Sequence, residues 1–212
     1  MIARNVATAD LILASQSPRR KYLLEQAGLT FRVIPSRVDE SDRPLATPAD
    51  YVRRLAEAKA GDVAGSHPDS WVLGADTIVT VDHRLLGKPA SPRDAREMLE
   101  RLSGKTHQVY TGFCLVQQRR SRCIADTVQT DVVFKTLSAR EIDWYIHTGE
   151  PFDKAGAYAI QGLGTFLVRR INGSYTNVVG LPVCEVVEIL LREGVMGLEV
   201  RPGEQHIRQE QP

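Results

Sequence analysis

The chain has 212 residues, of which 42% are hydrophobic, and its 27 basic and 26 acidic residues leave a net charge of +1. This size and composition suit the core of one domain or of two closely packed lobes, and the balanced charge argues against a general nucleic-acid binder. The apolar runs are short and no signal peptide is visible, so we expect a cytoplasmic protein with no membrane and no nucleic-acid partner.

The first predicted unit is a short strand over 11–14 followed by a helix. Ser17 suits the N-cap and Pro18 suits the first helical position. The next three residues, Arg19 to Lys21, are cations at the positive end of the helix dipole, where cations are disfavoured. A bound anion would remove this conflict, because free N–H groups and the cations would hold it together. The stretch therefore predicts an anion site, with three solvated cations on an exposed face as the alternative.

Strand and helix patterns alternate through the rest of the N-terminal half. We expect strands over 31–35, 71–73 and 78–81, and helices over 48–63 and 91–102. The first of these helices is expected to turn four residues inward: Tyr51, Leu55, Ala58 and Val63. The polar loop over 36–48 carries two acids, Asp39 and Glu40, which suit a hard cation or a solvated turn.

The C-terminal half is richer in strand patterns. We expect long strands over 107–116 and 124–134, a third strand over 166–171, and helices over 138–149 and 182–192. Three cysteines have neither zinc nor disulfide spacing and are expected to be buried and reduced: Cys114, Cys123 and Cys184. The chain divides into an N-terminal extension over 1–10, one domain over 11–192 and a polar tail over 193–212. The fold class is α/β with a mixed sheet and two lobes around a groove.

Three further features carry candidate chemistry. Asp76 follows an apolar run at an expected strand end, where it would hold a metal, act as a base, or bond its own backbone in a turn. Lys88 lies in a short loop, and alone it reads as solvated. The glycine-containing segment 153–164 carries Gln161, whose amide has the donor and acceptors to contact a nucleobase edge. Together, the cationic helix start, two acidic clusters, a lysine and this loop suit a polyphosphate bound through a divalent metal.

Long segments of the chain match one family in sequence and in order. They are LILASQSPRRKYLLEQAG (11–28), LGADTIV (73–79), GKP (87–89), LSGKTHQVYTG (102–112) and GEPFDKAGAYAIQGLGTFLVRRINGSYTNVVGLP (149–182). From about residue 11 to 191 the chain resembles the Maf family of nucleoside triphosphate pyrophosphatases. The resemblance implies a two-lobed Maf/ITPase-like fold, with an elongated mixed β-sheet flanked by helices and a deep central groove. It also implies hydrolysis of a nucleoside triphosphate to the monophosphate and pyrophosphate with a divalent cation (Mg²⁺, Mn²⁺ or Co²⁺), and a homodimer.

The same resemblance assigns roles to individual residues. Asp76 matches the proton acceptor and a metal ligand, and Glu40, favoured over Asp39, is the second acid on the metal. The residues that match the dTTP/UTP subgroup are Arg19, Thr77 and Gln161. Other groove positions are matched by Ser15, Arg20, Lys59, Lys88 and Lys154. Two departures are the 1–10 extension and Ala159, where glycine is frequent.

Two alternatives stay open at this point. One is the same chemistry on a modified nucleotide, although a subgroup for 7-methyl-GTP would carry tryptophan, glutamine and glutamate at the three marker positions. The other is a non-catalytic regulator of cell division that binds DNA or a partner, which the near-neutral charge disfavours for DNA.

Overall fold

The computed structural model describes residues 2–7, 9–39 and 47–201. A seven-stranded sheet runs through the middle of the molecule in the order β3-β2-β4-β6-β7-β8, with β5 paired to β4. Its strands are β2 (Leu11–Leu13), β3 (Arg32–Val33), β4 (Trp71–Val81), β5 (Arg84–Leu86), β6 (Thr106–Gln117), β7 (Arg122–Phe134) and β8 (Val168–Asn172). The strand β2 pairs in parallel with β3 and β4, and the other pairs are antiparallel. The predicted α/β class with an elongated mixed sheet is confirmed.

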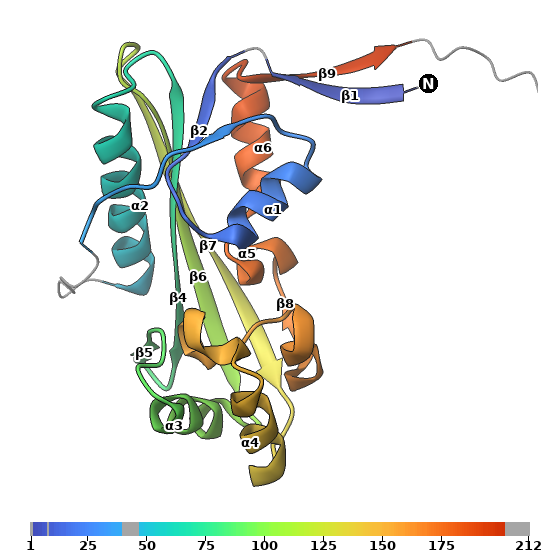
Figure 1. Ribbon diagram of the computed structural model, residues 1–212. Coiled ribbons are helices and arrows are strands. Elements are labelled where there is room, and N and C mark those ends of the chain that lie inside the picture. Colours follow the sequence, from blue (N-terminus) through green and yellow to red (C-terminus); the bar gives the residue numbers. More distant parts are fainter. Residues whose placement is uncertain (1, 8, 40–46, 202–212) are drawn as a thin grey trace, which may run out of the picture.

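Helices cover both faces of this sheet (Figure 1). The helices are α1 (Pro18–Gln26), α2 (Pro48–Ala64), α3 (Pro92–Leu102), α4 (Ala139–His147), α5 (Tyr175–Val179) and α6 (Val183–Arg192). The helix α2 lies along one face, whereas α1, α5 and α6 lie on the other face near one end. Helices α3 and α4 sit at the far end, with three 3-10 turns: η1 (Glu150–Asp153), η2 (Ala155–Ala157) and η3 (Gly162–Leu167).

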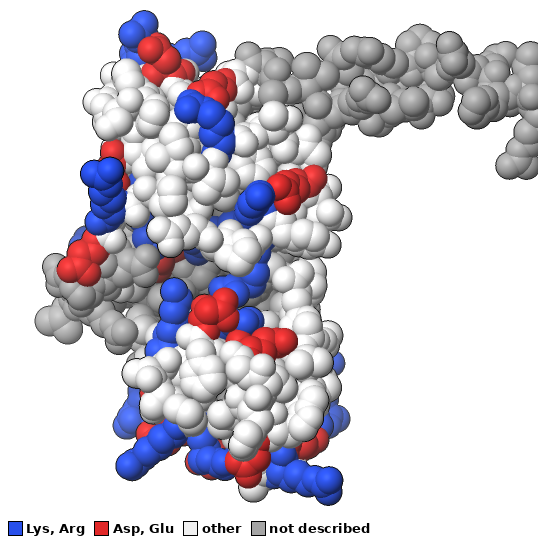
Figure 2. Space-filling model, viewed as in Figure 1, with Lys and Arg blue, Asp and Glu red and all other residues white. Residues whose placement is uncertain are grey.

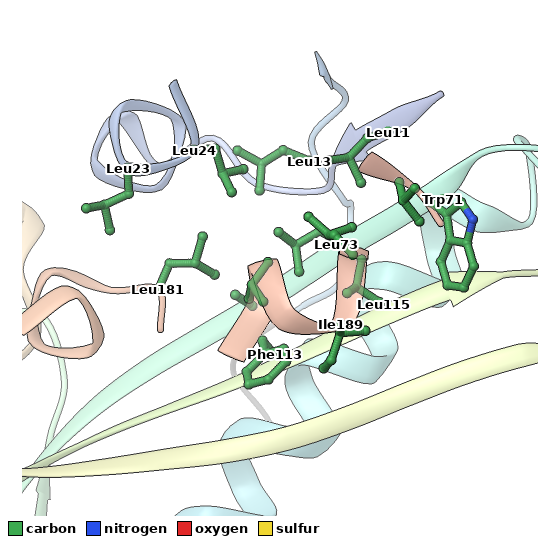
Figure 3. Packing of buried hydrophobic residues seen from close by; sticks show 14 of the residues in the cluster. Leu11, Leu13, Leu23, Leu24, Trp71, Leu73, Phe113, Leu115, Leu181 and Ile189 are labelled. Atoms are coloured by element: carbon green, nitrogen blue, oxygen red, sulfur yellow. The ribbon is translucent and has the colours of Figure 1, made fainter. Parts of the chain in front are cut away.

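The buried side chains form two large clusters on one face of the sheet. Figure 3 shows the first, in which leucines of β2 and α1 pack against Leu73, Phe113 and Ile189. The second cluster joins the far ends of β4, β6 and β7 to α3 and α4 around Val79, Phe134 and other apolar residues. Side chains alternate between the two faces along β4, so its odd-numbered residues lie on the face that carries both clusters. Thr77 is on this face too, between the residues of the first cluster and those of the second. This polar residue marks the boundary between the two lobes.

The strand β4 is longer than the sequence predicts. Separate strands over 71–73 and 78–81, with Asp76 at a strand end, were expected, but β6 pairs with β4 continuously from Val72 to Thr80. The other edge of β4 differs, because β2 pairs only with residues 71–73 and β5 only with 79–81. Among the described residues no strand covers 74–78 on that edge. Asp76 is therefore in mid-strand, at an uncovered edge of the sheet.

Two glycines bring α2 directly onto the sheet. A Cβ at Gly74 would lie 2.3 Å from the carbonyl oxygen of Ala56, and one at Gly112 would lie 2.4 Å from the carbonyl carbon of Val52. The helix face that meets the sheet carries Val52 and Ala56, and both are buried, as are Tyr51 and Val63. The expectation that Ala58 faces inward is wrong, because this orientation of the helix leaves Ala58 exposed. Leu55 is half-buried.

Two described segments that lie far apart in the sequence pair in a ribbon that the sequence did not predict. The strands β1 (Ile2–Ala7) and β9 (Met196–Arg201) pair antiparallel, in register from Ile2 opposite Arg201 to Ala7 opposite Met196. The ribbon extends away from the body (Figure 1). The division into 1–10, 11–192 and 193–212 stays a prediction. Within the described ranges no helix is long and apolar enough to cross a membrane.

Other differences from the predicted elements are local. The strand expected from residue 166 begins at Val168, because 162–167 form a 3-10 helix instead. The strand β5 and the helix α5 were missed. Of the three free cysteines, Cys114 is buried as expected, but Cys123 and Cys184 are exposed, so the expectation is wrong for these two.

Candidate active site

A groove of about 740 Å³ opens beside the uncovered edge of β4. Figure 2 shows the surface hollowed between the two ends of the molecule, with Lys and Arg side chains along the hollow. Nine of the ten residues that the sequence singled out line it: Ser15, Arg19, Arg20, Lys59, Asp76, Thr77, Lys88, Lys154 and Gln161. The tenth, Glu40, lies outside the described residues. Among the described residues, the lining carries five Lys or Arg side chains and two Asp, an excess of positive charge that suits a polyphosphate.

Asp76 and Lys59 form a buried ion pair in the wall of the groove. The Lys59 ammonium donates to Oδ1 of Asp76 at 2.7 Å, and the two side chains are only 8% and 10% exposed. The pair exists because Asp76 and the two close-packing glycines, Gly74 and Gly112, share the face of the sheet that α2 covers. No described residue donates to Oδ2 of Asp76, which leaves this oxygen for a water or a cation.

Thr77 points to the opposite face and joins a chain of hydrogen bonds. Its hydroxyl oxygen lies 3.1 Å from Nη2 of Arg20 and 2.9 Å from the hydroxyl of Thr111. Thr111 donates its proton to the carbonyl of Asn177 at 3.1 Å, so it accepts from Thr77, and Thr77 accepts from Arg20. Thr111 is fully buried and, within the described residues, contacts the groove only through Thr77. The sequence did not single it out, although it lies in the 102–112 match and directly opposite Thr77 on β6.

The Arg20 guanidinium is held in place by the fold. Its Nε donates to the carbonyl of Gly180 at 2.8 Å, and its Nη1 donates to Ser15 at 3.1 Å. The N-cap role of Ser17 is confirmed, since its side chain accepts from the Arg20 N–H. The alternative of three solvated cations on an exposed face is wrong for Arg20, which these contacts bury.

Arg19 reaches across the groove to the other lobe. It donates to Oδ2 of Asp153 at 2.7 Å, and Lys154 donates to Oδ1 of the same carboxylate at 2.5 Å. Partial burial acts to raise the pKa of Asp153, but these two hydrogen bonds outweigh it and lower the pKa below its usual value. The sequence indicates Asp153 only as part of a glycine-containing segment. In the structure it bridges two of the predicted groove cations, Arg19 and Lys154.

The end of the groove at Gln161, which the sequence predicts to contact a nucleobase, is formed by two short loops. The loop that carries Lys88 is tied to the second lobe, because the N–H of Gly156 donates to the carbonyl of Gly87 at 3.0 Å. Lys88 itself is exposed at the rim, and Gln161 is half-buried at the start of η3. Tyr158 also lines the groove and belongs to the buried cluster of the second lobe.

The donor set suits a magnesium-type cation only in part. Carboxylate oxygen is the ligand that such a cation prefers, and Asp76 offers one. In the part of the chain that the structure describes, no group of three or more His, Cys, Asp or Glu side chains gathers to hold a metal. A cation here would therefore take most of its ligands from a bound polyphosphate and water, as Mg²⁺ commonly does.

Comparison with known proteins decides the family. Residues 10–193 match the family model described as Maf-like protein. The chain belongs to the Maf family. A relative from Syntrophus aciditrophicus, called dTTP/UTP pyrophosphatase, is 51% identical over 95% of this chain and 97% of its own length. One with the same description from Halalkalibacterium halodurans is 50% identical over 87% of this chain and 96% of its own.

Among solved structures, a HAM1 protein from Coxiella burnetii aligns with 60% of this Maf chain and 73% of its own. The identity is 15% and the TM-score is 0.40. The placement in the Maf family rests on the sequence matches.

Proposed function

We propose that this Maf protein is a nucleoside triphosphate diphosphatase that hydrolyses dTTP and UTP to the monophosphate and pyrophosphate. The observation that carries the proposal is the clustering of Arg19, Thr77 and Gln161 around one groove with the Lys59–Asp76 pair. Relatives about half identical over most of the chain are called dTTP/UTP pyrophosphatases, which supports the same substrates here. Such an enzyme would remove triphosphates from the nucleotide pool of the cytoplasm.

In the proposed reaction, Asp76 orients a water or takes its proton as that water attacks the α-phosphorus, and pyrophosphate leaves. The Lys59 ammonium, 2.7 Å from Oδ1, fixes the position of this carboxylate. Arg19, Arg20 and Lys88 offset the charge that develops on the phosphates. The catalysis is thus chiefly positioning and electrostatics within a preformed groove.

A divalent cation belongs to the proposal. Asp76 would hold it together with an acid of the 36–48 loop, for which the proposal names Glu40. When bound, such a cation would neutralise charge on the phosphate oxygens. Comparing Mg²⁺, Mn²⁺ and Co²⁺ in the assay identifies the preferred metal. A homodimer is also part of the proposal, and sedimentation equilibrium tests it.

Product analysis tests the reaction class. Purified protein with dTTP and each metal should yield dTMP and pyrophosphate in equal amounts, and chelation of the metal should stop the reaction. Products of dTDP and inorganic phosphate would assign the protein to a different reaction at the same groove. Binding of nucleotide without any product would instead favour a non-catalytic role.

A further inference from the structure

Glu150 is the centre of a hydrogen-bond cluster behind the end of the groove at Gln161. It begins η1, directly after Gly149, whose φ is +76°. Its Oε1 accepts from the Tyr145 hydroxyl at 2.8 Å and from the N–H of Gly164 at 2.9 Å. Its Oε2 accepts from the N–H of Leu163 at 2.9 Å. One carboxylate therefore holds a helix side chain and two backbone groups of the loop that follows Gln161.

Tyr145 extends the hydrogen-bond cluster to the part of the loop that precedes Gln161. Its side chain is fully buried, and its oxygen accepts from the N–H of Ala159 at 3.1 Å. A phenol that donates its one proton to a carboxylate still accepts at its oxygen, so the two bonds are compatible. The backbone is consequently fixed at 159 and again at 163–164, on both sides of Gln161.

The loop backbone packs closely against the side chains of Glu150 and Tyr145. Gly162 has a φ of +69°, and a Cβ there would lie 2.7 Å from Oε2 of Glu150. A Cβ at Gly164 would lie 2.6 Å from the Tyr145 oxygen. Glycine at both positions lets the chain wrap around the cluster, which a side chain would prevent.

Gln161 takes its position from this backbone. Its side chain lines the groove, and within the described ranges no residue hydrogen bonds to its amide. The carbonyl of Glu150 also accepts from the Lys154 ammonium at 2.6 Å, so the same residue borders a second groove side chain.

We infer that Glu150 is a positioning residue for base recognition, which with Tyr145 fixes the loop 158–164 and so holds the Gln161 amide at this end of the groove. The inference rests on the proposed function, in which Gln161 contacts the pyrimidine. A carboxylate only accepts hydrogen bonds, which matches the three donors that meet it here. An amide at 150 would turn its NH₂ group toward at least one of them.

The test compares Glu150→Gln with the unchanged protein on dTTP, UTP and GTP. We expect KM for dTTP to rise about tenfold with a smaller change in kcat, and the preference for dTTP over GTP to fall by a similar factor, because misplaced polar groups lose discrimination. The inhibition constant of inorganic pyrophosphate, a ligand without a base, should change less than about twofold. Tyr145→Phe should shift the preference in the same direction but less, since it removes the hydroxyl's bonds to Glu150 and Ala159 but leaves Glu150 bonded to Leu163 and Gly164.

Glu141→Gln is the matched control, because it makes the same chemical change on the same lobe. Glu141 caps α4 and contacts Lys135, and it does not contact the loop. This variant should lower Tm while keeping the nucleotide preference. Hydrogen exchange at Leu163 and Gly164 is a readout that does not depend on activity, and it should accelerate in Glu150→Gln only.

An unchanged nucleotide preference in Glu150→Gln would overturn the inference, as would an equal loss for dTTP, GTP and pyrophosphate binding. An unchanged protein that releases no pyrophosphate from dTTP or UTP overturns the proposed function instead. In that case hydrogen exchange still decides whether Glu150 fixes the loop, because slow exchange in the variant refutes that claim.

Discussion

Lys59 and Asp76 face each other across the junction of α2 and β4, with the ammonium 2.7 Å from a carboxylate oxygen. Both side chains are almost completely buried, so breaking the pair would leave a buried charge without this partner. Their approach is possible because Gly74 and Gly112 leave room for the α2 backbone against the sheet. Packing of the helix and placement of the proposed catalytic carboxylate are therefore one structural feature.

Asp76→Asn tests both roles of this carboxylate. It keeps the size of the side chain but removes its charge and basicity, so pyrophosphate release from dTTP should fall at least about 100-fold. The unfolding free energy should also fall by about 3 kcal/mol, because a buried ammonium loses its carboxylate partner. Urea unfolding and steady-state kinetics measure the two effects.

The double variant Lys59→Met/Asp76→Asn separates the effect on activity from the effect on stability. It removes the buried ammonium as well, so stability should recover toward that of the unchanged protein while activity stays low. Near-normal pyrophosphate release by either variant would exclude Asp76 from the mechanism.

Gly112→Ala should disturb the site from a distance. The added methyl group would meet the carbonyl carbon of Val52 at 2.4 Å, so α2 must move away from β6. We expect a loss of about 1–3 kcal/mol in unfolding free energy, together with reduced kcat as Lys59 shifts from Asp76. Thermal unfolding and kinetics on dTTP check this.

Gly61→Ala is its control on the same helix. Apart from its chain neighbours and the backbone of α2 itself, no atom lies within 4 Å of a Cβ at Gly61. Alanine there should stabilise α2 by about 0.5–1 kcal/mol and leave kcat unchanged. Equal effects of the two substitutions would show that close helix packing does not place the ion pair.

Arg20→Ala should weaken both the fold and nucleotide binding. The sequence alone predicts a ligand-binding cation whose loss leaves stability unchanged or slightly raised. Arg20 instead donates to Gly180, Ser15 and Thr77, so its removal should cost about 1–3 kcal/mol of stability as well as raise KM. Lys21→Ala, one residue along and exposed, should change neither. If Arg20→Ala were as stable as the unchanged protein, Arg20 would be a ligand-binding cation with no structural role, as the sequence alone predicts.

The sequence predicts most elements because their local signals are strong. The caps at Ser17 and Ser138 and the prolines at helix starts set the beginnings of α1, α3 and α4 within a residue. Long alternating runs likewise set β6 and β7. The pairing of β1 with β9 could not be predicted, because it joins residues at opposite ends of the chain.

The site was predicted as a set of residues but not as a set of contacts. Family resemblance selects Lys59 and Asp76, yet only the packing of α2 on Gly74 and Gly112 brings them together. The bridge from Arg19 to Asp153 spans 134 residues and leaves no local pattern. The metal acid Glu40 lies outside the described residues, so its role stays a prediction.

His107 should make the protein less stable at mildly acidic pH. It is fully buried, with Nε2 2.7 Å from the Tyr158 hydroxyl, and burial lowers its pKa from 6.5 to about 4, although Asp131 acts in the opposite direction. Between these values the unfolded chain takes up a proton that the folded chain does not, so stability falls as pH drops from 6.5 to 4. The unfolding free energy should fall by about 3 kcal/mol in total over this range.

Urea unfolding at several pH values between 7.5 and 4.5 measures this loss. His107→Gln keeps a polar group toward Tyr158 but does not titrate, so its stability should vary less over the same range. The same pH dependence in both proteins would assign the effect to other groups.

The assignment of dTTP and UTP as substrates is decided by kcat/KM for pyrophosphate release from dTTP, UTP, ATP, GTP and 7-methyl-GTP. Arg19, Thr77 and Gln161 border the same groove, and the amide of Gln161 can pair with the donor and acceptor edge of thymine or uracil. We therefore expect clear preference for dTTP and UTP, and a marked loss of dTTP activity in Gln161→Glu, whose carboxylate would face the pyrimidine carbonyls. Equal or better use of 7-methyl-GTP by the unchanged protein would contradict the assignment.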